Sequence, residues 1–197
     1  MGQSDVNLAA LISSRICHDL ISPIGAINNG LELLGMSGDR EGPEIELITE
    51  SVENASARIR FFRIAYGAAS DQPMGRSEVI TILRDMMGNG RLTVAYGPMD
   101  DQPRWAVRMV FLAIQCLETS MPYGGRIEVS CDAGKWIISG HSPKFNADPA
   151  LWQVLTGADL DTLAPAHVQF ALLPAVAGDA RRSISYELSD EKMTIGF

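Results

Sequence analysis

A histidine and an aspartate stand side by side at positions 18 and 19, within a stretch that follows the periodicity of a helix. At about 100° per residue, His18 lies almost opposite the apolar side of this helix, so we expect its ring in solvent. An imidazole nitrogen acts as a nucleophile when a neighbouring acid orients the ring or takes up its proton. The pair therefore predicts a nucleophilic His18, with Asp19 as its catalytic partner, that a second molecule can reach.

A single histidine on a solvated helix face is most often only a surface residue. The residues around His18 therefore decide whether a functional role is expected for it. Pro23 interrupts the same helical pattern, although proline costs on the order of 3 kcal/mol relative to alanine inside a helix. The apolar pattern continues beyond Pro23, which indicates a kink rather than a helix end. Small or polar residues share the side of His18 and predict a surface for a docking partner: Ser14, Arg15, Ser22, Gly25 and Asn29, with Gly30 beside them.

Two long helices are expected to present His18. The first covers residues 6–34 and ends in a polar turn, and the second begins near Pro43. Each carries an apolar stripe, Ile12, Ile16, Leu20, Ile24, Ile27, Leu31 and Leu34 on the first and Ile45, Ile48, Val52, Ala55, Ile59, Phe62 and Tyr66 on the second. Two antiparallel helices cannot cover both stripes. We therefore expect a homodimer in which two hairpins form a four-helix bundle, in preference to stripes that pack on the rest of the chain.

Residues 18–34, with the sequence H-D-L-I-S-P-I-G-A-I-N-N-G-L-E-L-L, resemble the histidine box of histidine-kinase dimerisation and phosphotransfer domains. More narrowly, they resemble the ChpT-type histidine phosphotransferases of alphaproteobacterial phosphorelays. The resemblance implies that His18 passes a phosphoryl group between aspartates of two receiver domains, one from a hybrid histidine kinase and the other from a response regulator. It also implies that Asp19 orients the ring, that Ser22 and Arg15 assist the transfer, and that magnesium comes from the receiver.

The helical periodicity of the apolar residues ends after the second predicted helix. Residues 68–75 predict a linker between two domains, a hairpin domain over 1–70 and a second domain over 76–197. In the second domain we expect helices over 77–87 (capped by Ser77), 103–121 and 165–176, short helical pieces over 149–163, and strands over 91–96, 127–131, 136–139, 183–188 and 193–197. The predicted fold class is α+β, an antiparallel helical hairpin followed by an α/β sandwich with helices on one face of a mixed sheet.

This order of elements resembles the ATP-binding domain of histidine kinases, but the residues that hold ATP there are missing. Leu112 and Cys116 occupy the positions that best match the magnesium-binding asparagines, and residues 139–143 read S-G-H-S-P in place of Asp-x-Gly-x-Gly. No glycine-rich phosphate loop precedes residue 165. We therefore expect a degenerate ATPase-like domain without bound nucleotide or metal. An autophosphorylating kinase and a non-catalytic dimeric scaffold for receiver domains remain the alternatives.

Composition limits the classes of partner and the cellular compartments that we expect for this chain. The net charge of −8 argues against nucleic-acid binding, which requires clustered basic residues. The three cysteines are odd in number and far apart, which indicates reduced thiols. No signal sequence or membrane-spanning run is evident, so we expect a cytoplasmic protein. His141 and His167 are isolated and expected to be surface residues, and the arginines at 58, 60 and 63 are expected to solvate one side of the second helix, with an acceptor-binding role left open.

Overall fold

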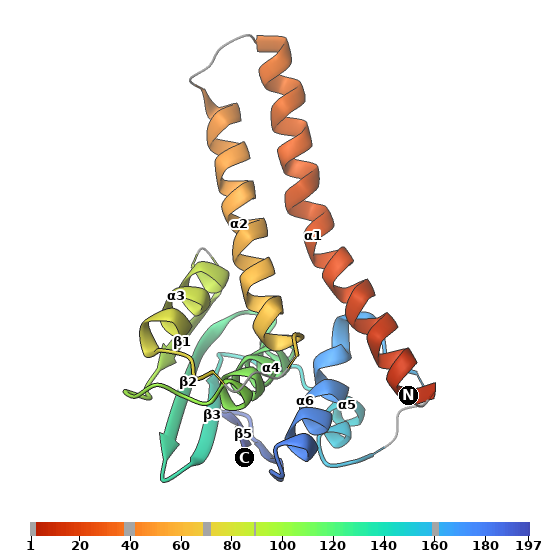
Figure 1. Ribbon diagram of the computed structural model, residues 1–197, viewed down its shortest axis with the longest axis vertical. Helices are drawn as coiled ribbons and strands as arrows, with labels where there is room; N and C mark the ends of the chain where they lie inside the picture. The colour runs from red at the N-terminus through yellow and green to blue at the C-terminus, as the bar shows by residue number, and fades with distance from the viewer. Residues whose placement is uncertain (1–2, 38–41, 69–71, 89, 159–161) are drawn as a thin grey trace.

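The structure is a computed structural model that describes residues 3–37, 42–68, 72–88, 90–158 and 162–197. Two long antiparallel helices, α1 (Gln3–Ser37) and α2 (Pro43–Ala65), extend from an α/β domain (Figure 1). α2 begins at Pro43 as expected, because proline suits the first helical turn. α1 runs past the predicted stop at Gly35 to Ser37, and the rest of the predicted turn lies outside the described residues.

The two apolar stripes are only partly buried within the chain. On α2, Ala55 and Phe62 are buried. Three other members of the stripe, spaced seven residues apart, are between 37 and 53 % exposed: Ile45, Val52 and Ile59. On α1, Ile24 and Leu31 are also about half exposed. Within a single chain these five side chains are left uncovered, as expected for two helices that cannot cover both stripes, because each helix packs its interior side on the other and leaves the edge of its stripe open.

The first turns of α1 behave differently from its middle. Leu8, Ile12 and Ile16 are partly buried against the hydrophobic core of the α/β domain, and α1 contacts α6 (Val168–Asp179) there (Figure 1). For this end of the helix, the alternative that the stripe packs on the rest of the chain is correct. α1 therefore contacts α2 along its upper part and the α/β domain at its beginning.

A five-stranded mixed sheet forms the base of the α/β domain. Its order is β1-β2-β3-β5-β4, with β1 parallel to β2 and all other neighbours antiparallel. The strands are β1 (Leu92–Tyr96), β2 (Gly125–Asp132), β3 (Lys135–His141), β4 (Ser185–Leu188) and β5 (Met193–Gly196). β2 and β3 are joined at Ala133 and Gly134, whose φ angles of 48° and 79° suit the predicted tight turn. The expected strands and both hairpins are confirmed.

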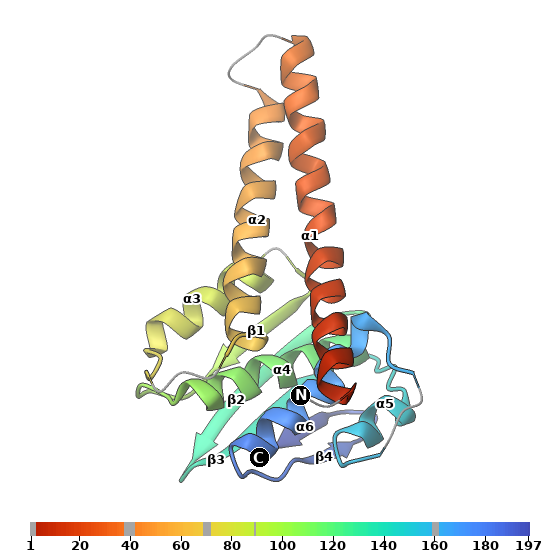
Figure 2. The ribbon, with the colours of Figure 1, turned by 45° about the vertical axis from the view of Figure 1, so that its right-hand side comes forward.

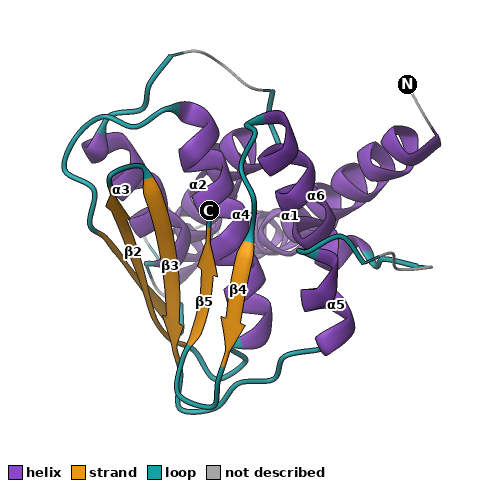
Figure 3. Cartoon of the chain, turned by 90° about the horizontal axis from the view of Figure 1, so that it is seen from below, coloured by secondary structure: helices purple, strands orange, loops and turns teal. Residues whose placement is uncertain are grey.

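The helices of this domain lie on one face of the sheet, as Figures 2 and 3 show. They are α3 (Arg76–Met87), α4 (Arg104–Ser120), α5 (Pro149–Val154) and α6, which follows the short 3₁₀ turn η1 (Pro165–His167). Two expectations are wrong in detail. Gly75, not Ser77, precedes the first residue of α3, and the first three residues of the helix expected at 165 form η1, after which α6 begins at Val168.

The hairpin and the α/β domain share one hydrophobic core. Phe61 of α2 stacks on Phe111 of α4 with ring centroids 4.6 Å apart and planes 7° from parallel. Near the end of α2, the Tyr66 hydroxyl lies 3.1 Å from Gln115 Oε1, and Arg108 Nε donates to the Ala65 carbonyl over 3.2 Å. The lower part of α2 therefore belongs to the core of the α/β domain, although the sequence assigned it to the hairpin.

Two glycines of α1 give a matched test of this packing. A Cβ at Gly25 would have no neighbour within 4 Å, whereas a Cβ at Gly30 would lie 2.6 Å from Ile48 Cγ1. Gly25→Ala should raise the free energy of unfolding by about 0.5–1 kcal/mol, the gain in helix propensity. Gly30→Ala should lower it, because overpacking costs about 1–3 kcal/mol. Denaturant unfolding at one protein concentration tests the ordering, and equal effects would contradict the close approach of α1 and α2 at Gly30.

Candidate functional site

His18 lies on the outer surface of α1, with 81 % of its side chain exposed. The predicted outward orientation of the ring is confirmed. Its Nδ1 lies 3.0 Å from Asp19 Oδ1. An ionised carboxylate can only accept hydrogen bonds, so in this contact Nδ1 carries the proton. The other ring nitrogen, Nε2, then keeps its lone pair for a partner that approaches from solvent.

Asp19 is held from its other oxygen by Arg15, one helical turn earlier. Arg15 Nε donates to Asp19 Oδ2 over 2.7 Å, and only 9 % of the Asp19 side chain is exposed. The Arg15 guanidinium also donates to the backbone carbonyl of Ala166 in η1. The catalytic pair predicted from sequence is thus part of a larger group, and the contribution of Ala166 has no sequence signal because 151 residues separate it from Arg15.

The predicted docking residues differ in how open they are. Ser14, Ser22 and Asn29 are exposed, and the space around Gly25 is empty. Arg15 instead turns toward Asp19 and η1, and only 18 % of its side chain is exposed. Gly30 was expected on the open side and is buried against α2, because its missing side chain lets Ile48 approach. The open surface around His18 therefore consists of Ser14, Ser22, Gly25 and Asn29.

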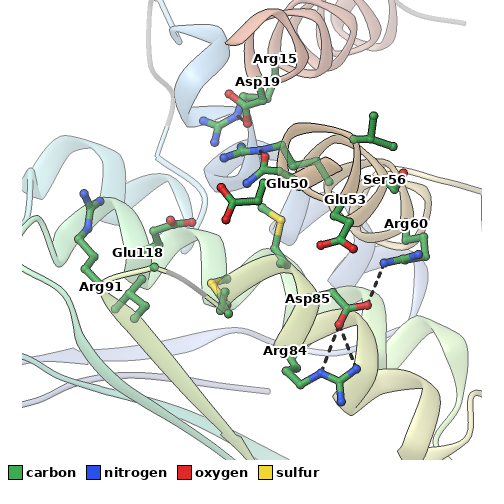
Figure 4. A pocket seen from close by; sticks show the side chains of 18 residues that line it. Arg15, Asp19, Glu50, Glu53, Ser56, Arg60, Arg84, Asp85, Arg91 and Glu118 are labelled. Carbon is green, nitrogen blue, oxygen red and sulfur yellow. Dashed lines mark hydrogen bonds and ion pairs between the residues drawn. The ribbon is translucent and has the colours of Figure 1, made fainter. Parts of the chain in front are cut away.

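Beside this surface, α1, α2, α3 and α4 enclose an open cavity of about 1080 Å³ lined by many charged side chains (Figure 4). Asp85 of α3 joins two of its walls, since Arg60 of α2 donates to it over 2.8 Å. Arg84, the preceding residue of α3, also donates to Asp85 over 3.1 Å. Arg15 and Asp19 form the α1 side of the cavity. Arg60 therefore ties α2 to α3, which is a more specific role than the solvating one expected for it.

Glu118 of α4 also lines the cavity and was not singled out from the sequence. Burial raises the pKa of this carboxyl, while the positive charges of Arg15, Arg91 and Arg58 act in the opposite direction. The available signal was that Glu118 is the single acid in a mostly apolar helix. Its neighbours come from α1, α2 and the residue just before β1, so the sequence could not have placed it near Asp19.

The two positions expected to match the magnesium-binding asparagines of kinases lie inside α4. Leu112 and Cys116 are 0 % exposed and belong to the core. Nearby, the Ser142 hydroxyl donates to the Gly124 carbonyl over 2.8 Å, so the S-G-H-S-P segment is tied to the sheet. Among the described residues, no group of three or more His, Cys, Asp or Glu side chains could hold a metal ion, and no helix is long and apolar enough to cross a membrane.

The remaining histidines lie away from this chemistry. His141 is the last residue of β3 and its Nε2 lies 3.9 Å from Glu128 Oε2. His167 ends η1 and meets the ring of Phe170 edge to face. Both are partly exposed, as expected for surface residues. The described cysteines are free thiols, of which Cys17 is exposed and Cys116 is buried.

Residues 76–192 match the family described as the histidine phosphotransferase C-terminal domain, which is more than half of the chain. The chain belongs to the ChpT-type histidine phosphotransferases. It is 32 % identical over 196 residues to the protein phosphotransferase ChpT of Brucella abortus, and the match covers 95 % of this chain and 93 % of that protein. It is thus a phosphorelay histidine phosphotransferase and not a conventional histidine kinase, as the longer sequence of residues 18–34 and the missing ATP-binding residues indicated.

Solved structures agree with this family. A bacterial phosphotransferase superposes on the histidine phosphotransferase with a TM-score of 0.82 at 29 % identity, covering 100 % of this chain and 98 % of the other. The histidine kinase ThkA, solved in complex with the response regulator TrrA, gives a TM-score of 0.51 at 12 % identity over 99 % of this chain and 62 % of that chain. The second likeness shows the fold alone, which is that of a kinase hairpin with its ATPase-like domain.

Proposed function

We propose that this histidine phosphotransferase carries the phosphoryl group on Nε2 of His18, between an aspartyl phosphate of one receiver domain and the aspartate of another. The observation that carries the proposal is the geometry of the ring. His18 is exposed, and Asp19 accepts a hydrogen bond at Nδ1, which leaves Nε2 as the nucleophile. The family supports the relay, and the position of the ring supports His18 as the carrier.

In the first step the Nε2 lone pair attacks the phosphorus of the receiver's aspartyl phosphate. A P–N bond forms, the P–O bond breaks, and its electron pair leaves on the receiver's carboxylate. The ring becomes positively charged, and the Asp19 carboxylate stabilises this charge through the Nδ1–H hydrogen bond. In the second step an aspartate of the next receiver attacks the phosphorus, and the P–N electron pair returns to Nε2. A phosphorylated nitrogen that bears this charge remains a good leaving group.

Receivers would dock on the open surface formed by Ser14, Ser22, Gly25 and Asn29, with Arg15 at its edge. Small side chains there allow an approaching domain to reach His18. The partners we propose are the receiver domain of a hybrid histidine kinase and those of response regulators. The magnesium ion that neutralises the phosphoryl oxygens would come from the receiver, and the setting would be the cytoplasm.

His18→Ala should abolish acceptance of phosphoryl groups while leaving folding intact, because the ring packs against no core residue. His141→Ala is the matched control, since it removes a partly exposed histidine from the sheet. Transfer from a phosphorylated receiver would be followed by radiolabel, beside a thermal melt of each variant. Label retained in the His18 variant would refute the carrier, and label acquired directly from ATP would restore the kinase alternative. No label in the wild-type chain from any receiver would favour the scaffold.

We also propose that the protein is a homodimer through the hairpin. Eight of the eleven exposed large apolar side chains of the described residues belong to α1 and α2. Those at 24 and 31, and those at 45, 52 and 59, recur at intervals of seven residues, the spacing of a coiled-coil seam. Burying a half-exposed Leu or Ile contributes on the order of 1 kcal/mol, so two hairpins that pair along this seam gain enough to associate.

Two isoleucines of α2 separate association from folding. Ile59→Glu should give a folded monomer, because Ile59 is 53 % exposed and lies on the proposed seam. Ile48→Glu should instead lower the free energy of unfolding, because Ile48 faces Gly30 inside the hairpin. Analytical ultracentrifugation with circular dichroism distinguishes the two effects. A wild-type protein that sediments as a monomer at micromolar concentration would contradict the dimer.

Finally, we propose that the α/β domain binds no nucleotide. The complete burial of Leu112 and Cys116 supports this, because hydrocarbon and thiol groups in a packed core cannot replace the oxygen ligands of magnesium. Calorimetric titration with ATP and magnesium should give no binding heat beyond dilution. A dissociation constant in the micromolar range would overturn the proposal.

A further inference from the structure

We propose that Arg15 is a positioning residue through which the α/β domain holds Asp19, and thereby the tautomer and orientation of the His18 ring. The inference rests on the proposed function, because it takes His18 as the phosphoryl carrier. It assigns the α/β domain a direct part in the chemistry of the hairpin. The family resemblance had implied a different role for Arg15, the stabilisation of charge on the moving phosphoryl group.

Three contacts connect η1 of the α/β domain to the reacting ring. The Ala166 carbonyl accepts a hydrogen bond from a terminal nitrogen of the Arg15 guanidinium. Arg15 Nε donates to Asp19 Oδ2 over 2.7 Å, and Asp19 Oδ1 lies 3.0 Å from His18 Nδ1. Each oxygen of the Asp19 carboxylate thus has its own partner, one structural and one catalytic. The carboxylate cannot rotate away from His18 without losing its bond to Arg15.

The surroundings of Arg15 favour positioning over direct contact with substrate. Its side chain is 18 % exposed, against 81 % for His18. Its charge also acts on Glu118 of α4 and on Tyr66, which follows α2, so it sits among groups from both parts of the chain. A guanidinium fixed by Asp19 on one side and by η1 on the other would have to break these bonds to reach a phosphoryl group above His18.

Arg15 acts on catalysis through the position of one proton. A free neutral imidazole favours the tautomer with its proton on Nε2, and in that form Nε2 has no lone pair to attack phosphorus. A fixed carboxylate at Nδ1 favours the opposite tautomer. An unanchored Asp19 would populate the reactive tautomer and orientation less often. Small misplacements at a reacting centre cost up to about 100-fold in rate, so we expect Arg15→Ala to slow transfer by about 10- to 100-fold.

The first experiment is a double-mutant cycle on the rate of phosphoryl transfer from a phosphorylated receiver. It uses full-length wild type, Arg15→Ala, Asp19→Ala and the double variant. If Arg15 acts only through Asp19, the Arg15 change should have no further effect in the Asp19→Ala background. If Arg15 contacts the phosphoryl group directly, it should slow transfer by the same factor in both backgrounds, which would overturn the inference.

A second experiment does not depend on phosphoryl transfer and measures the tautomer of the His18 ring directly. Nitrogen-15 spectra of histidine-labelled protein report which ring nitrogen carries the proton, and the chain has only three histidines, so a His18→Ala spectrum assigns the signal. Wild type should show a predominant Nδ1–H form at His18, and Arg15→Ala should shift it toward Nε2–H. An unchanged tautomer population would overturn the inference even if transfer slowed.

Two further variants separate geometry from charge. Arg15→Lys keeps the charge but loses the planar fork that bonds Asp19 and Ala166 together, so it should not restore the rate, and full restoration would indicate charge alone. Arg84→Ala removes an exposed arginine from the same cavity and should leave rate and tautomer unchanged. If wild type accepts no phosphoryl group, the proposed function fails. If wild type accepts a phosphoryl group and Arg15→Ala transfers it at the wild-type rate, only the present inference fails.

Discussion

The stacking of Phe61 on Phe111 determines how the two parts of this molecule are related. It occurs deep in a single core that includes the last turns of α2 and most of α4. Because closely packed interiors resist displacement, the hairpin and the α/β domain are fixed relative to one another. The cavity between them, the burial of the first turns of α1 and the contact between Arg15 and η1 all require that fixed relation.

Much of the architecture could be predicted because local pattern and tertiary packing agree. The strands of the closing hairpin and the Ala133–Gly134 turn followed from alternation and turn residues, and the orientation of His18 followed from helical periodicity. The errors arose where one element has several environments. A helical wheel gave α1 one apolar face for a second hairpin to cover, although the first turns of the helix pack on the α/β domain. It also took the small size of Gly30 as room for a partner, when Ile48 fills that room.

Only part of the site could be predicted from the sequence, for a related reason. His18 and Asp19 are neighbours along the chain, so their adjacency, the helical periodicity around them and the histidine-box resemblance together indicated their chemistry. The Ala166 carbonyl and Glu118 come from distant segments, and a backbone carbonyl leaves no trace in residue types. At positions 112 and 116 the sequence showed a hydrocarbon side chain and a thiol, and the structure buries both completely in the core.

The shared core has a consequence for genetics. Most small domains unfold as a unit, and the contact of Phe61 with Phe111 makes the hairpin and the α/β domain part of one such unit. A substitution in the core of α4 would then reduce the amount of folded protein. A loss of about 1–2 kcal/mol in the free energy of unfolding changes cellular abundance several-fold. In a screen for lost signalling, such alleles would resemble alleles of His18. Protein levels, rather than phenotype alone, would separate them.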